Sequence, residues 1–594
     1  MNIAIDIETR DLKVNTTINY IGCYSENAAG KELFKVFRLP QDLDSFKQFI
    51  KKAQTKNNKF ILHNGKFDAV RILWSYGIDI HIDHDTMILA YLRSTVDELK
   101  DNRGKWLGLK YAAPRWLGVD NWDVSTSKKT STSDEDVIPY LRLDCKYTYK
   151  LYYKLIEDFP KERVSTYKLI IHALNAYKYI ELNGLCLDMK RLRETKANYA
   201  EVHSKTLQAL HALIGNTEIN FNSSKQLQEL LYDELKLPIL RYTNKGAPST
   251  GVEALVALKG KHPVVDLLLK YREAEKARTF LDSWEEEAIL HPDGHYYLHS
   301  NFNLHGTVTG RTSSSDVNLQ QIPRDKRLKS LFRSTVPGWE MVCMDYSQLE
   351  LRFAGLVADV KAIKESYLRG EDLHYKMAAT VTGKPIEEIT KEERTQAKAA
   401  NFGFLYGMQA KSFVEYAKLG YGVEVSEEQA MLIRERFFEL YPELLVYYDD
   451  VRQSLLTTSK QTSIMRREYE VNPMHLLNPY TRENILRPAI NFPVQSAGSD
   501  YVICGLVEIM NHPLLKDRVR LGATVHDSVI GLVKKDEHFY ETLALMKSIM
   551  ERPNLAQKLI TKEIDFPIVV DIEIGPLGFG VDVEEYKKKE PNNV

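Results

Sequence analysis

The sequence predicts a chain of several domains, in which an α/β domain is followed by long helices and then by a mixed sheet that a helical block interrupts. Residues 1–160 alternate strand-like and helical patterns, as an α/β domain does. Residues from about 165 to 300 read as long, charged helices, and strand patterns return from about 300 onward on both sides of a helical block at about 360–455. A chain of 594 residues is too long for one hydrophobic core, so three or four domains are expected.

The bulk composition excludes several classes of protein. With 44% hydrophobic and 27% charged residues, the chain reads as an ordinary soluble globular protein. Its five cysteines are scattered and form no CxxC pair, which favours reduced thiols in a cytoplasmic compartment over a disulfide frame or a zinc site. Neither a signal peptide nor a membrane-spanning segment is expected. A net charge of −1 means that any polyanion must bind through local basic clusters.

Acidic residues near the N-terminus form a candidate metal site. Asp6 and Glu8 alternate on a predicted strand and therefore point to one face. Asp68 enters a predicted helix, and Tyr140 and Asp144 are four apart on another. Carboxylates of this kind suit Mg²⁺ or Mn²⁺, and a two-ion site would hydrolyse a phosphodiester, with the Tyr140 hydroxyl orienting the water. Each motif alone is equally typical of solvated surface acids.

A second pair of carboxylates lies far downstream. Asp345 ends a predicted strand, and Asp527 lies at the tip of an apolar hairpin. On adjacent strands of one sheet, two such carboxylates could bind the pair of metal ions used for in-line phosphoryl transfer. On its own, Asp527 would be better explained as a turn-forming aspartate.

A helix between these two aspartates carries cations and rings in order. A capping box at Thr390 and Glu393 predicts its start. Two cations near the N-terminus would hold a triphosphate, and two rings further along would stack a base. An amphipathic helix with an aromatic core stripe is the alternative. The four residues, spaced by four and expected on one helical face, are Arg394, Lys398, Phe402 and Tyr406.

Taken in order, these motifs resemble two known families. Residues 6–8, 64–68 and 140–144 resemble the three motifs of the DEDDy 3′–5′ exonucleases. The segments around Asp345, residues 394–407 and Asp527 resemble motifs A, B and C of the family A DNA polymerases, the bacterial DNA polymerase I type. The segments 309–320 and 487–495 extend that resemblance, which then covers almost the whole chain.

The resemblance implies a ribonuclease H-like α/β exonuclease domain and an α+β polymerase domain of right-hand architecture. The implied divisions are the exonuclease domain at 1–160, the thumb with the start of the palm at 161–300, the palm with motif A at 301–360, the fingers with motif B at 361–455 and the palm with motif C at 456–594.

It also implies roles for individual residues. Lys398 would act as the acid for pyrophosphate, Glu350 would exclude a 2′-hydroxyl, and Tyr140 would serve the exonuclease reaction. The metal ligands would be Asp345, Tyr346 through its carbonyl, and Asp527 in one site, and Asp6, Glu8, Asp68 and Asp144 in the other. The nucleotide would contact Arg394, Lys398, Phe402, Tyr406, Glu350, Gln348 and His374. The DNA minor groove would contact Arg311, Asn318, Gln320, Arg487, Asn491, Gln495 and His526, contacts that are neutral to sequence.

Cofactors and partners follow from the same resemblance. Each active site would use two Mg²⁺ ions, with Mn²⁺ as a substitute, and the substrates would be primer–template DNA and dNTPs. A helicase, a primase or a processivity factor is a candidate partner. The protein is expected to be a monomer that does not bind a membrane. Because the exonuclease motif starts at residue 6, we expect no 5′-nuclease domain, which favours a phage or mobile-element replicase in the host cytoplasm. A bacterial or organellar origin stays open.

One departure and two alternatives complete the prediction. Ser528 stands where motif C usually carries Glu, so a third carboxylate near the ions is missing. Phe402, where some relatives have Tyr, predicts discrimination against dideoxynucleotides. A single-subunit RNA polymerase shares motifs A to C in outline, but Glu350 and Phe402 argue against it. A catalytically dead DNA-binding or scaffold subunit is disfavoured because the carboxylates are intact.

Overall fold

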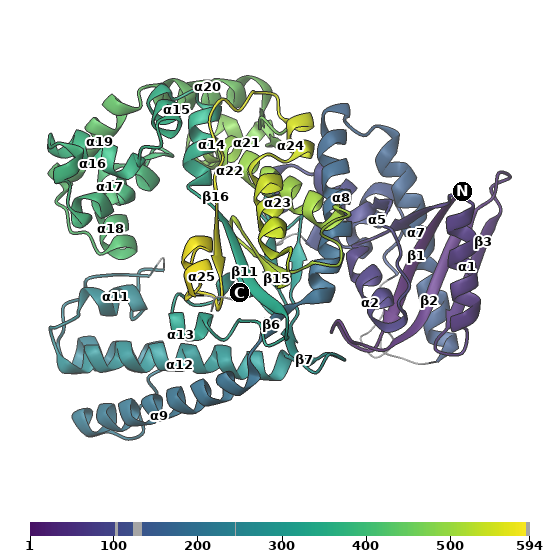
Figure 1. Ribbon diagram of the computed structural model, residues 1–594, viewed down its shortest axis with the longest axis horizontal. Coiled ribbons are helices and arrows are strands. Elements are labelled where there is room, and N and C mark those ends of the chain that lie inside the picture. Colours follow the sequence, from purple (N-terminus) through teal and green to yellow (C-terminus); the bar gives the residue numbers. More distant parts are fainter. Residues whose placement is uncertain (101–104, 123–132, 244, 590–594) are drawn as a thin grey trace.

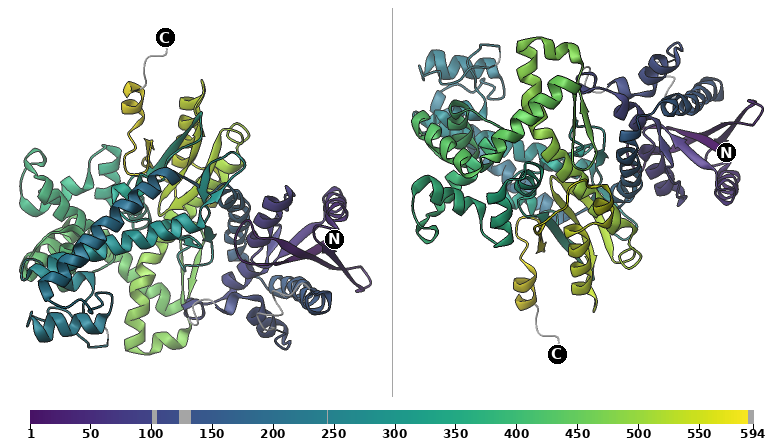
Figure 2. Two further views of the ribbon diagram at one scale, coloured as in Figure 1. Left: turned by 90° about the horizontal axis from the view of Figure 1, so that it is seen from below. Right: turned by 90° about the horizontal axis from the view of Figure 1, so that it is seen from above.

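A computed structural model describes residues 1–594 except for 101–104, 123–132, 244 and 590–594. The N-terminal α/β domain lies at one end of the molecule, and the long helices α9 and α12 extend toward the other, in all three views (Figure 1 and Figure 2). Among the described residues, no helix combines the length and hydropathy needed to cross a bilayer.

The first domain is built on a five-stranded sheet of order β3-β2-β1-β4-β5. The first three strands are antiparallel neighbours, and β4 and β5 continue the sheet in parallel with β1. The predicted α/β domain is therefore confirmed. Its strands are β1 (Asn2–Thr9), β2 (Ile18–Glu26), β3 (Glu32–Arg38), β4 (Lys59–Leu62) and β5 (His84–Asp85). Its helices are α1 (Leu43–Thr55), α2 (Lys66–Tyr76), α3 (Thr86–Arg93), α4 (Val96–Lys100), α5 (Leu109–Leu117) and α7 (Asp134–Glu157).

Close packing of α7 on the sheet fixes the position of its functional side chains. A Cβ built at Gly22 on β2 would lie 2.7 Å from the Cys145 sulfur and 2.8 Å from Leu141. Glycine is therefore required at this position, and it lets the helix approach the strand directly. The result is that α7 brings its acidic face up against β1.

Long helices follow, as the charge pattern predicts. Helices α9 and α12 pack against each other, and their far ends enclose a small second hydrophobic core that includes Leu210, Phe221 and Leu268. The elements of this region are the 3₁₀ turn Lys161–Arg163, α8 (Val164–Asn183), β6 (Leu185–Leu187), α9 (Met189–Ile214), α10 (Ser224–Gln228), the π-helical turn Glu229–Glu234, α11 (Val252–Ala257), α12 (Pro263–Glu287), β7 (Ile289–Leu290) and β8 (Tyr296–Leu298). Strands β6, β8 and β7 form a small antiparallel sheet.

The central sheet has the order β14-β15-β11-β16 and is antiparallel throughout. The expectation of a mixed sheet is wrong, because β14 and β15 form a hairpin whose second strand runs antiparallel to β11. The elements around it are β9 (Asn301–Asn303), β10 (Ser313–Ser315), the 3₁₀ turn Leu319–Gln321, α13 (Lys326–Lys329), β11 (Trp339–Tyr346), α14 (Leu349–Val357), α22 (Pro479–Asn511), β14 (Val519–Val525), β15 (Ser528–Lys534), α23 (Phe539–Glu551), α24 (Asn554–Leu559), β16 (Val570–Ile574) and α25 (Val583–Lys589).

A helical block interrupts this sheet between β11 and β14, as predicted, and lies to one side of it in Figure 1. Its elements are α15 (Lys361–Leu368), α16 (Leu373–Thr382), the 3₁₀ turn Ile386–Glu388, α17 (Lys391–Phe404), α18 (Ala410–Tyr421), α19 (Glu427–Leu440) and α20 (Glu443–Thr458), after which β12 (Lys460–Thr462), β13 (Glu468–Glu470) and α21 (Pro473–Leu477) lead back to α22.

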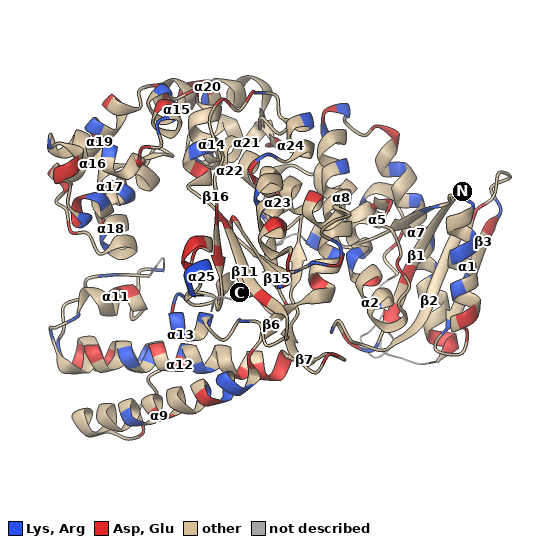
Figure 3. Cartoon of the chain, viewed as in Figure 1, with Lys and Arg blue, Asp and Glu red and all other residues tan. Residues whose placement is uncertain are grey.

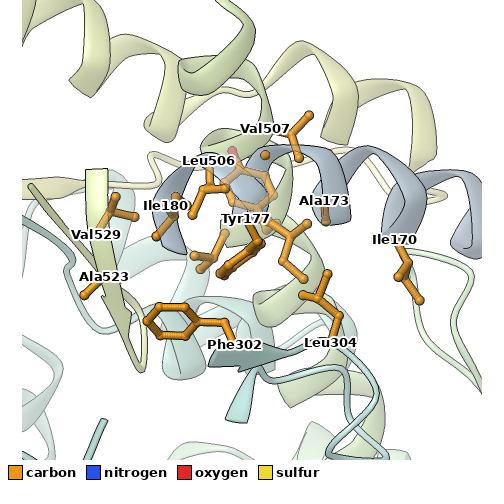
Figure 4. Close-up of a cluster of buried hydrophobic side chains, with 14 of the residues drawn as sticks. Ile170, Ala173, Tyr177, Ile180, Phe302, Leu304, Leu506, Val507, Ala523 and Val529 are labelled. Carbon is orange, nitrogen blue, oxygen red and sulfur yellow. The ribbon is translucent and has the colours of Figure 1, made fainter. Parts of the chain in front are cut away.

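Helix α8 joins the first domain to the rest through a continuous apolar core. Ile170, Ala173 and Tyr177 of α8 are buried together with Phe302 of β9 and Leu506 of α22 (Figure 4). The hydrophobic core is therefore shared by the α/β domain and the central sheet rather than divided between them.

Two buried ion pairs reinforce this junction. Lys66 of α2 pairs with Glu181 of α8, and both side chains are less than a tenth exposed. Arg467, which follows β12, pairs with Asp500 of α22 and lies close to the Tyr91 hydroxyl of the first domain. Breaking either pair would leave a buried charge without its partner.

Candidate active sites

The first acidic centre lies where β1 meets α7. Asp6 and Glu8 come from the strand and Asp144 from the helix, and their ligand atoms all lie within 4.8 Å of one another. Tyr140 is one turn before Asp144 on the same helix. The structure thus brings together three of the four carboxylates predicted for this site.

The fourth carboxylate, Asp68, is buried on α2 outside this trio. Its Oδ1 accepts a hydrogen bond from the backbone N–H of Ile7 at 3.1 Å, which holds it alongside β1 at the residue between the two acids of the strand. Burial raises the pKa of Asp68 to about 8. Its charge is close enough to raise the pKa of Asp6 as well.

The electrostatics of this centre favour a cation. Burial raises the pKa of Asp6 well above its usual range, and the charges of Asp68, Asp144 and Glu8 raise it further. Three hard oxygen donors at this spacing fit a hard divalent ion. The residues present therefore fit the predicted metal ions.

A lysine and a tryptophan already contact this centre. The Lys110 ammonium of α5 forms an ion pair with Asp144 and lies 4.0 Å from the centre of the Tyr140 ring. The Trp122 indole N–H donates a hydrogen bond of 2.5 Å to Asp144 Oδ1. The sequence analysis missed both residues because no motif contains them. The packing of α5 on α7 brings Lys110 to the site, and the segment that follows α5 brings Trp122.

The second acidic centre lies at one edge of the central sheet. Asp345, on β11, is paired in register with Ser528, so Asp527 at the tip of the β14–β15 hairpin is its neighbour. Burial raises the pKa of Asp345 to about 6, with a further contribution from the Asp527 charge. Burial also raises the pKa of Asp527, which the Arg311 guanidinium opposes. Two adjacent carboxylates with raised pKa values fit a divalent cation.

Other side chains near Asp345 modify this charge. Ser528 is buried, and its hydroxyl donates to the Val525 carbonyl at 2.8 Å, so it closes the hairpin turn and supplies no charge. Asp571 on β16 is paired in register with Asp345 from the other side, and the charges of Asp571 and Glu573 both raise the pKa of Asp345. The acidic residues of β11 and β16 are visible in Figure 3. Tyr346 is buried and its hydroxyl donates to the Met550 carbonyl at 2.8 Å.

Helix α17 carries most of the predicted nucleotide residues. The capping box between Thr390 and Glu393 is present as predicted. The helix ends at Phe404, however, so the expectation that Tyr406 lies on it is wrong. The Tyr448 hydroxyl satisfies the carbonyls of Phe404 and Leu405, and Gly407 has a φ of +77°, which turns the chain away.

The two cations of α17 differ in their surroundings. Arg394 forms a two-point ion pair with Asp372, through Nε at 3.1 Å and Nη2 at 2.6 Å. Lys398 is exposed, and no ion pair or hydrogen bond joins it to the described part of the chain. His374, which Asp372 precedes by two residues, is buried and contacts the Phe402 ring at 5.9 Å between ring centres.

The predicted sugar-selecting residue bridges two elements. Glu350, in the first turn of α14, accepts a hydrogen bond of 2.6 Å from the Tyr406 hydroxyl, and the Arg311 guanidinium lies 3.8 Å from its other oxygen. Gln348 precedes α14 with a φ of +53° and accepts a hydrogen bond from the Tyr367 hydroxyl at 3.1 Å. Glu350 therefore lies between the helical block and the central sheet.

The predicted DNA residues fall into two groups. Arg487, Asn491 and Gln495 are four apart on α22 and share one face, which is at least partly exposed. Gln320 donates to the Thr524 carbonyl of β14 at 3.3 Å, which places it near the hairpin tip that carries His526. Asn318 caps the 3₁₀ turn Leu319–Gln321, which contains Gln320. The first group therefore lies on α22, and the second lies around the 3₁₀ turn and the tip of the β14–β15 hairpin.

A hollow of about 920 Å³ lies between the first domain and the segments 280–289, 299–301 and 316–318. Asn64 and Arg71 of the first domain line it on one side, and Asp316 and Asn318 line it on the other. Residues of the exonuclease-like motif and of the predicted DNA-binding set thus face the same space.

Two acidic centres on one chain, one of them linked through Glu350 and Tyr406 to the end of a cation-bearing helix, define a phosphoryl-transfer enzyme with two sites that fit divalent metal ions. A family model described as DNA polymerase family A matches residues 189–577, and one described as 3′–5′ exonuclease matches residues 1–159. The chain belongs to DNA polymerase family A and carries a 3′–5′ exonuclease domain at its N-terminus.

Individual relatives agree with this assignment. The DNA polymerase of Bacillus phage SP01 is 27% identical over 606 residues, covering 89% of this chain and 64% of the phage protein. DNA polymerase I of Aquifex aeolicus is 30% identical over 569 residues, covering 92% of this chain and 91% of that protein. The chain spans 46% of the thermostable DNA polymerase I of Thermus aquaticus, at 30% identity over 68% of this chain.

A solved structure supports the fold. The POL domain of Pol1 from M. smegmatis, in a complex with DNA primer-template and dNTP, matches with a TM-score of 0.80 over 97% of this chain and 95% of that one, at 23% identity. The predicted fold class, an α/β exonuclease domain with an α+β polymerase domain of right-hand architecture, is confirmed.

Proposed function

We propose that this chain extends the 3′ end of a DNA primer with deoxynucleotides under the direction of a template, and that its N-terminal domain removes misincorporated nucleotides in the 3′–5′ direction. The observation that carries the proposal is the pairing of Asp345 with the hairpin that presents Asp527, together with the hydrogen bond from Tyr406 to Glu350. Glu350 is close enough to Asp527 to raise its pKa, and Tyr406 follows the helix that carries Arg394 and Lys398. This link supports a site in which carboxylates hold metal ions and cations bind phosphates.

In this proposal the domain divisions follow the five ranges given above, and Asp345, Asp527 and the Tyr346 carbonyl hold the ions of the polymerase site. Two Mg²⁺ ions, when bound, would activate the primer hydroxyl and neutralise the leaving pyrophosphate. Arg394 and Lys398 bind the triphosphate, and Lys398, exposed on α17, supplies a proton to the leaving group.

The sugar and the base are selected by the neighbours of Glu350. The Tyr406 hydroxyl holds the Glu350 carboxylate at 2.6 Å, where it excludes a 2′-hydroxyl. Phe402 packs beside the sugar, and Gln348 and His374 add polar contacts. The minor groove of the primer–template contacts Arg311, Asn318, Gln320, Arg487, Asn491, Gln495 and His526.

In the exonuclease site, Asp6, Glu8 and Asp144, with Asp68 behind them, would hold Mg²⁺ or Mn²⁺. Tyr140 orients the attacking water, and Lys110 balances the carboxylate charge until an ion binds. The compact spacing of the three carboxylates supports a hydrolytic role, because a water and a phosphodiester could both bind to the two metal ions that such a site would hold.

The biological setting belongs to the proposal as well. We place the protein in the cytoplasm as a monomer that replicates a phage or mobile-element genome, in line with its similarity to the phage polymerase. A helicase, a primase or a processivity factor would be its partners. Extension of a primed single-stranded circle with and without each candidate would identify them.

A primer-extension assay tests the polymerase proposal. With Mg²⁺ and all four dNTPs the wild-type chain should extend a labelled primer, and Asp527→Asn should lose about a thousandfold in rate. Asp517→Asn, an exposed aspartate near β14, is the matched control and should extend normally. Normal extension by the Asp527 variant would refute the mapped site.

A further inference from the structure

A buried amide in α17 faces the imidazole that α16 carries. Asn401 is 0% exposed and His374 is 2% exposed, so water does not separate them. The amide nitrogen of Asn401 lies 2.9 Å from His374 Nδ1 and 3.3 Å from the backbone carbonyl oxygen of Leu373. These two contacts join the helix that carries Arg394 and Lys398 to the helix that carries His374.

The Leu373 carbonyl fixes the orientation of this amide. A carbonyl oxygen only accepts hydrogen bonds, so the NH₂ group of Asn401 must face it. Rotating the amide by 180° would place Asn401 Oδ1 against the Leu373 carbonyl oxygen. On its other side Asn401 Oδ1 has no hydrogen-bond partner in the described structure, so no contact there favours the rotated form. The same NH₂ group therefore donates to His374 Nδ1, which must be unprotonated.

A histidine with a bare Nδ1 carries its only proton on Nε2. No group of the described residues forms a hydrogen bond with Nε2 of His374, and this nitrogen is not fully sealed from solvent. The ring thus keeps one N–H donor available to a ligand, close to the Phe402 ring whose centre lies 5.9 Å away.

The surrounding charges keep this ring neutral. Burial lowers the pKa of His374 to about 4; the nearby Asp372 carboxylate opposes this shift, and the Arg394 and Lys398 cations add to it. Protonation would also place a second N–H against the Asn401 amide donors. His374 therefore donates without charge across the physiological pH range.

We propose that Asn401 is a positioning residue for nucleotide binding, which holds His374 in the neutral Nε2–H form so that the ring donates one hydrogen bond to a non-bridging oxygen of the incoming triphosphate. This inference rests on the proposed function, in which His374 contacts that triphosphate. Burial keeps the ring neutral, and the Asn401 amide decides which of its two nitrogens carries the proton.

The first test uses the full wild-type chain without nucleotide. In protein labelled with ¹⁵N-histidine, the His374 resonances, assigned by their loss in His374→Gln, should report a protonated Nε2 and a bare Nδ1 from pH 5.5 to 8. A protonated Nδ1 in this range would overturn the proposal. This measurement needs no variant at position 401, so it decides the tautomer even if a buried substitution prevents folding.

The second test separates positioning from a purely structural role. In Asn401→Asp the new carboxylate accepts a proton from Nδ1, so the Nε2–H form is lost; the KM for dNTP should rise about tenfold, should vary with pH between 6 and 8, and kcat should change less. In the His374→Gln background the same substitution should have little further effect on KM. An equal rise in both backgrounds would overturn the proposal.

The outcomes distinguish this inference from the proposed function. A wild-type chain that extends no primer would refute the polymerase assignment, whereas the resonances of His374 would still be measured. Extension by the wild type together with an unchanged dNTP KM in His374→Gln would refute the triphosphate contact and, with it, the positioning role of Asn401.

Discussion

The two acidic centres differ in how the negative charge of their carboxylates is offset. In the exonuclease centre three carboxylates lie within 4.8 Å of one another, and an internal ammonium, Lys110, is paired with one of them. In the polymerase centre Asp345 and Asp527 lie where β11 and the β14–β15 hairpin end, and neither side chain forms an ion pair with another described residue. The protein itself therefore offsets part of the charge of the first centre, whereas the charge of the second is left for ligands to offset.

The difference follows from how each centre is built. Asp6, Glu8 and Asp144 come from a strand and a helix that press together at Gly22 within one domain. The polymerase residues come from β11, the hairpin tip and the helical block, which are far apart in sequence. A compact site can be preformed by packing, whereas a site between several elements must accommodate a long substrate and its metal ions.

The largest expected effect separates the two centres completely. Asp6→Ala should lower single-strand degradation by about a thousandfold and leave primer extension unchanged, because the Asp345 site lies in another domain. Asp44→Ala, an exposed acid on α1, should leave both activities intact. Measuring both reactions on one preparation checks the prediction, and loss of both activities in the Asp6 variant would contradict the two-site arrangement.

A smaller effect is expected from the sugar-selecting contact. Glu350→Ala removes the carboxylate that the Tyr406 hydroxyl holds, so ribonucleotide incorporation should rise about tenfold to a hundredfold relative to deoxynucleotides. Competitive incorporation of one rNTP against its dNTP measures this ratio. The matched control is Glu387→Ala, an exposed glutamate of the helical block. A ratio unchanged from the wild type would show that Glu350 does not select the sugar.

The charge balance of the exonuclease centre gives a third prediction. Lys110→Met removes the ammonium that competes with a divalent ion for Asp144, so the site should bind Mn²⁺ about tenfold more tightly. Calorimetric titration of the Asp527→Asn background would isolate this site from the other. Lys47→Met, at an exposed position of α1, should not change the affinity. Weaker binding in the Lys110 variant would mean that the lysine supports the metal rather than competing with it.

The smallest effect concerns stability without metal ions. Because the pKa of Asp345 is about 6 in the folded state and near 3.8 when unfolded, its ionisation lowers the stability of the fold as the pH rises from about 4 through 6. Asp345→Asn removes this cost. Because the side chain retains contact with solvent, the gain should be about 1 kcal/mol at pH 8 and should vanish at pH 4.

Thermal unfolding at the two pH values, in a chelating buffer, measures this gain. Mg²⁺ should stabilise the wild type more than the variant, because the cation offsets the charge that the substitution removes. A variant that is less stable than the wild type at pH 8 would show that Asp345 is held by a favourable contact.

Much of the fold and of both centres could be predicted because short motifs carry them. The alternation of Asp6 and Glu8, the four-residue spacing of Tyr140 and Asp144, and the capping box of α17 are local patterns, and the structure contains each of them. The roles assigned to the site residues and the exact domain divisions stay predictions, since they depend on metal ions and DNA.

The rest depended on contacts that no local pattern encodes. Tyr406 leaves α17 because Tyr448, on another helix, satisfies the last carbonyls. Asp372 and Lys110 reach their partners only through helix packing. The antiparallel character of the central sheet follows from strand order, which periodicity cannot reveal.

The buried pair of Lys66 and Glu181 has a mechanical consequence. Opening a hinge between the first domain and α8 would separate this ion pair and expose the apolar core around it, so both hold the joint closed. The Arg467–Asp500 pair next to Tyr91 stiffens the same joint. These contacts resist a change in the distance between the two acidic centres. Under the proposed function, a primer terminus that needs editing would cover that distance by unwinding from its template.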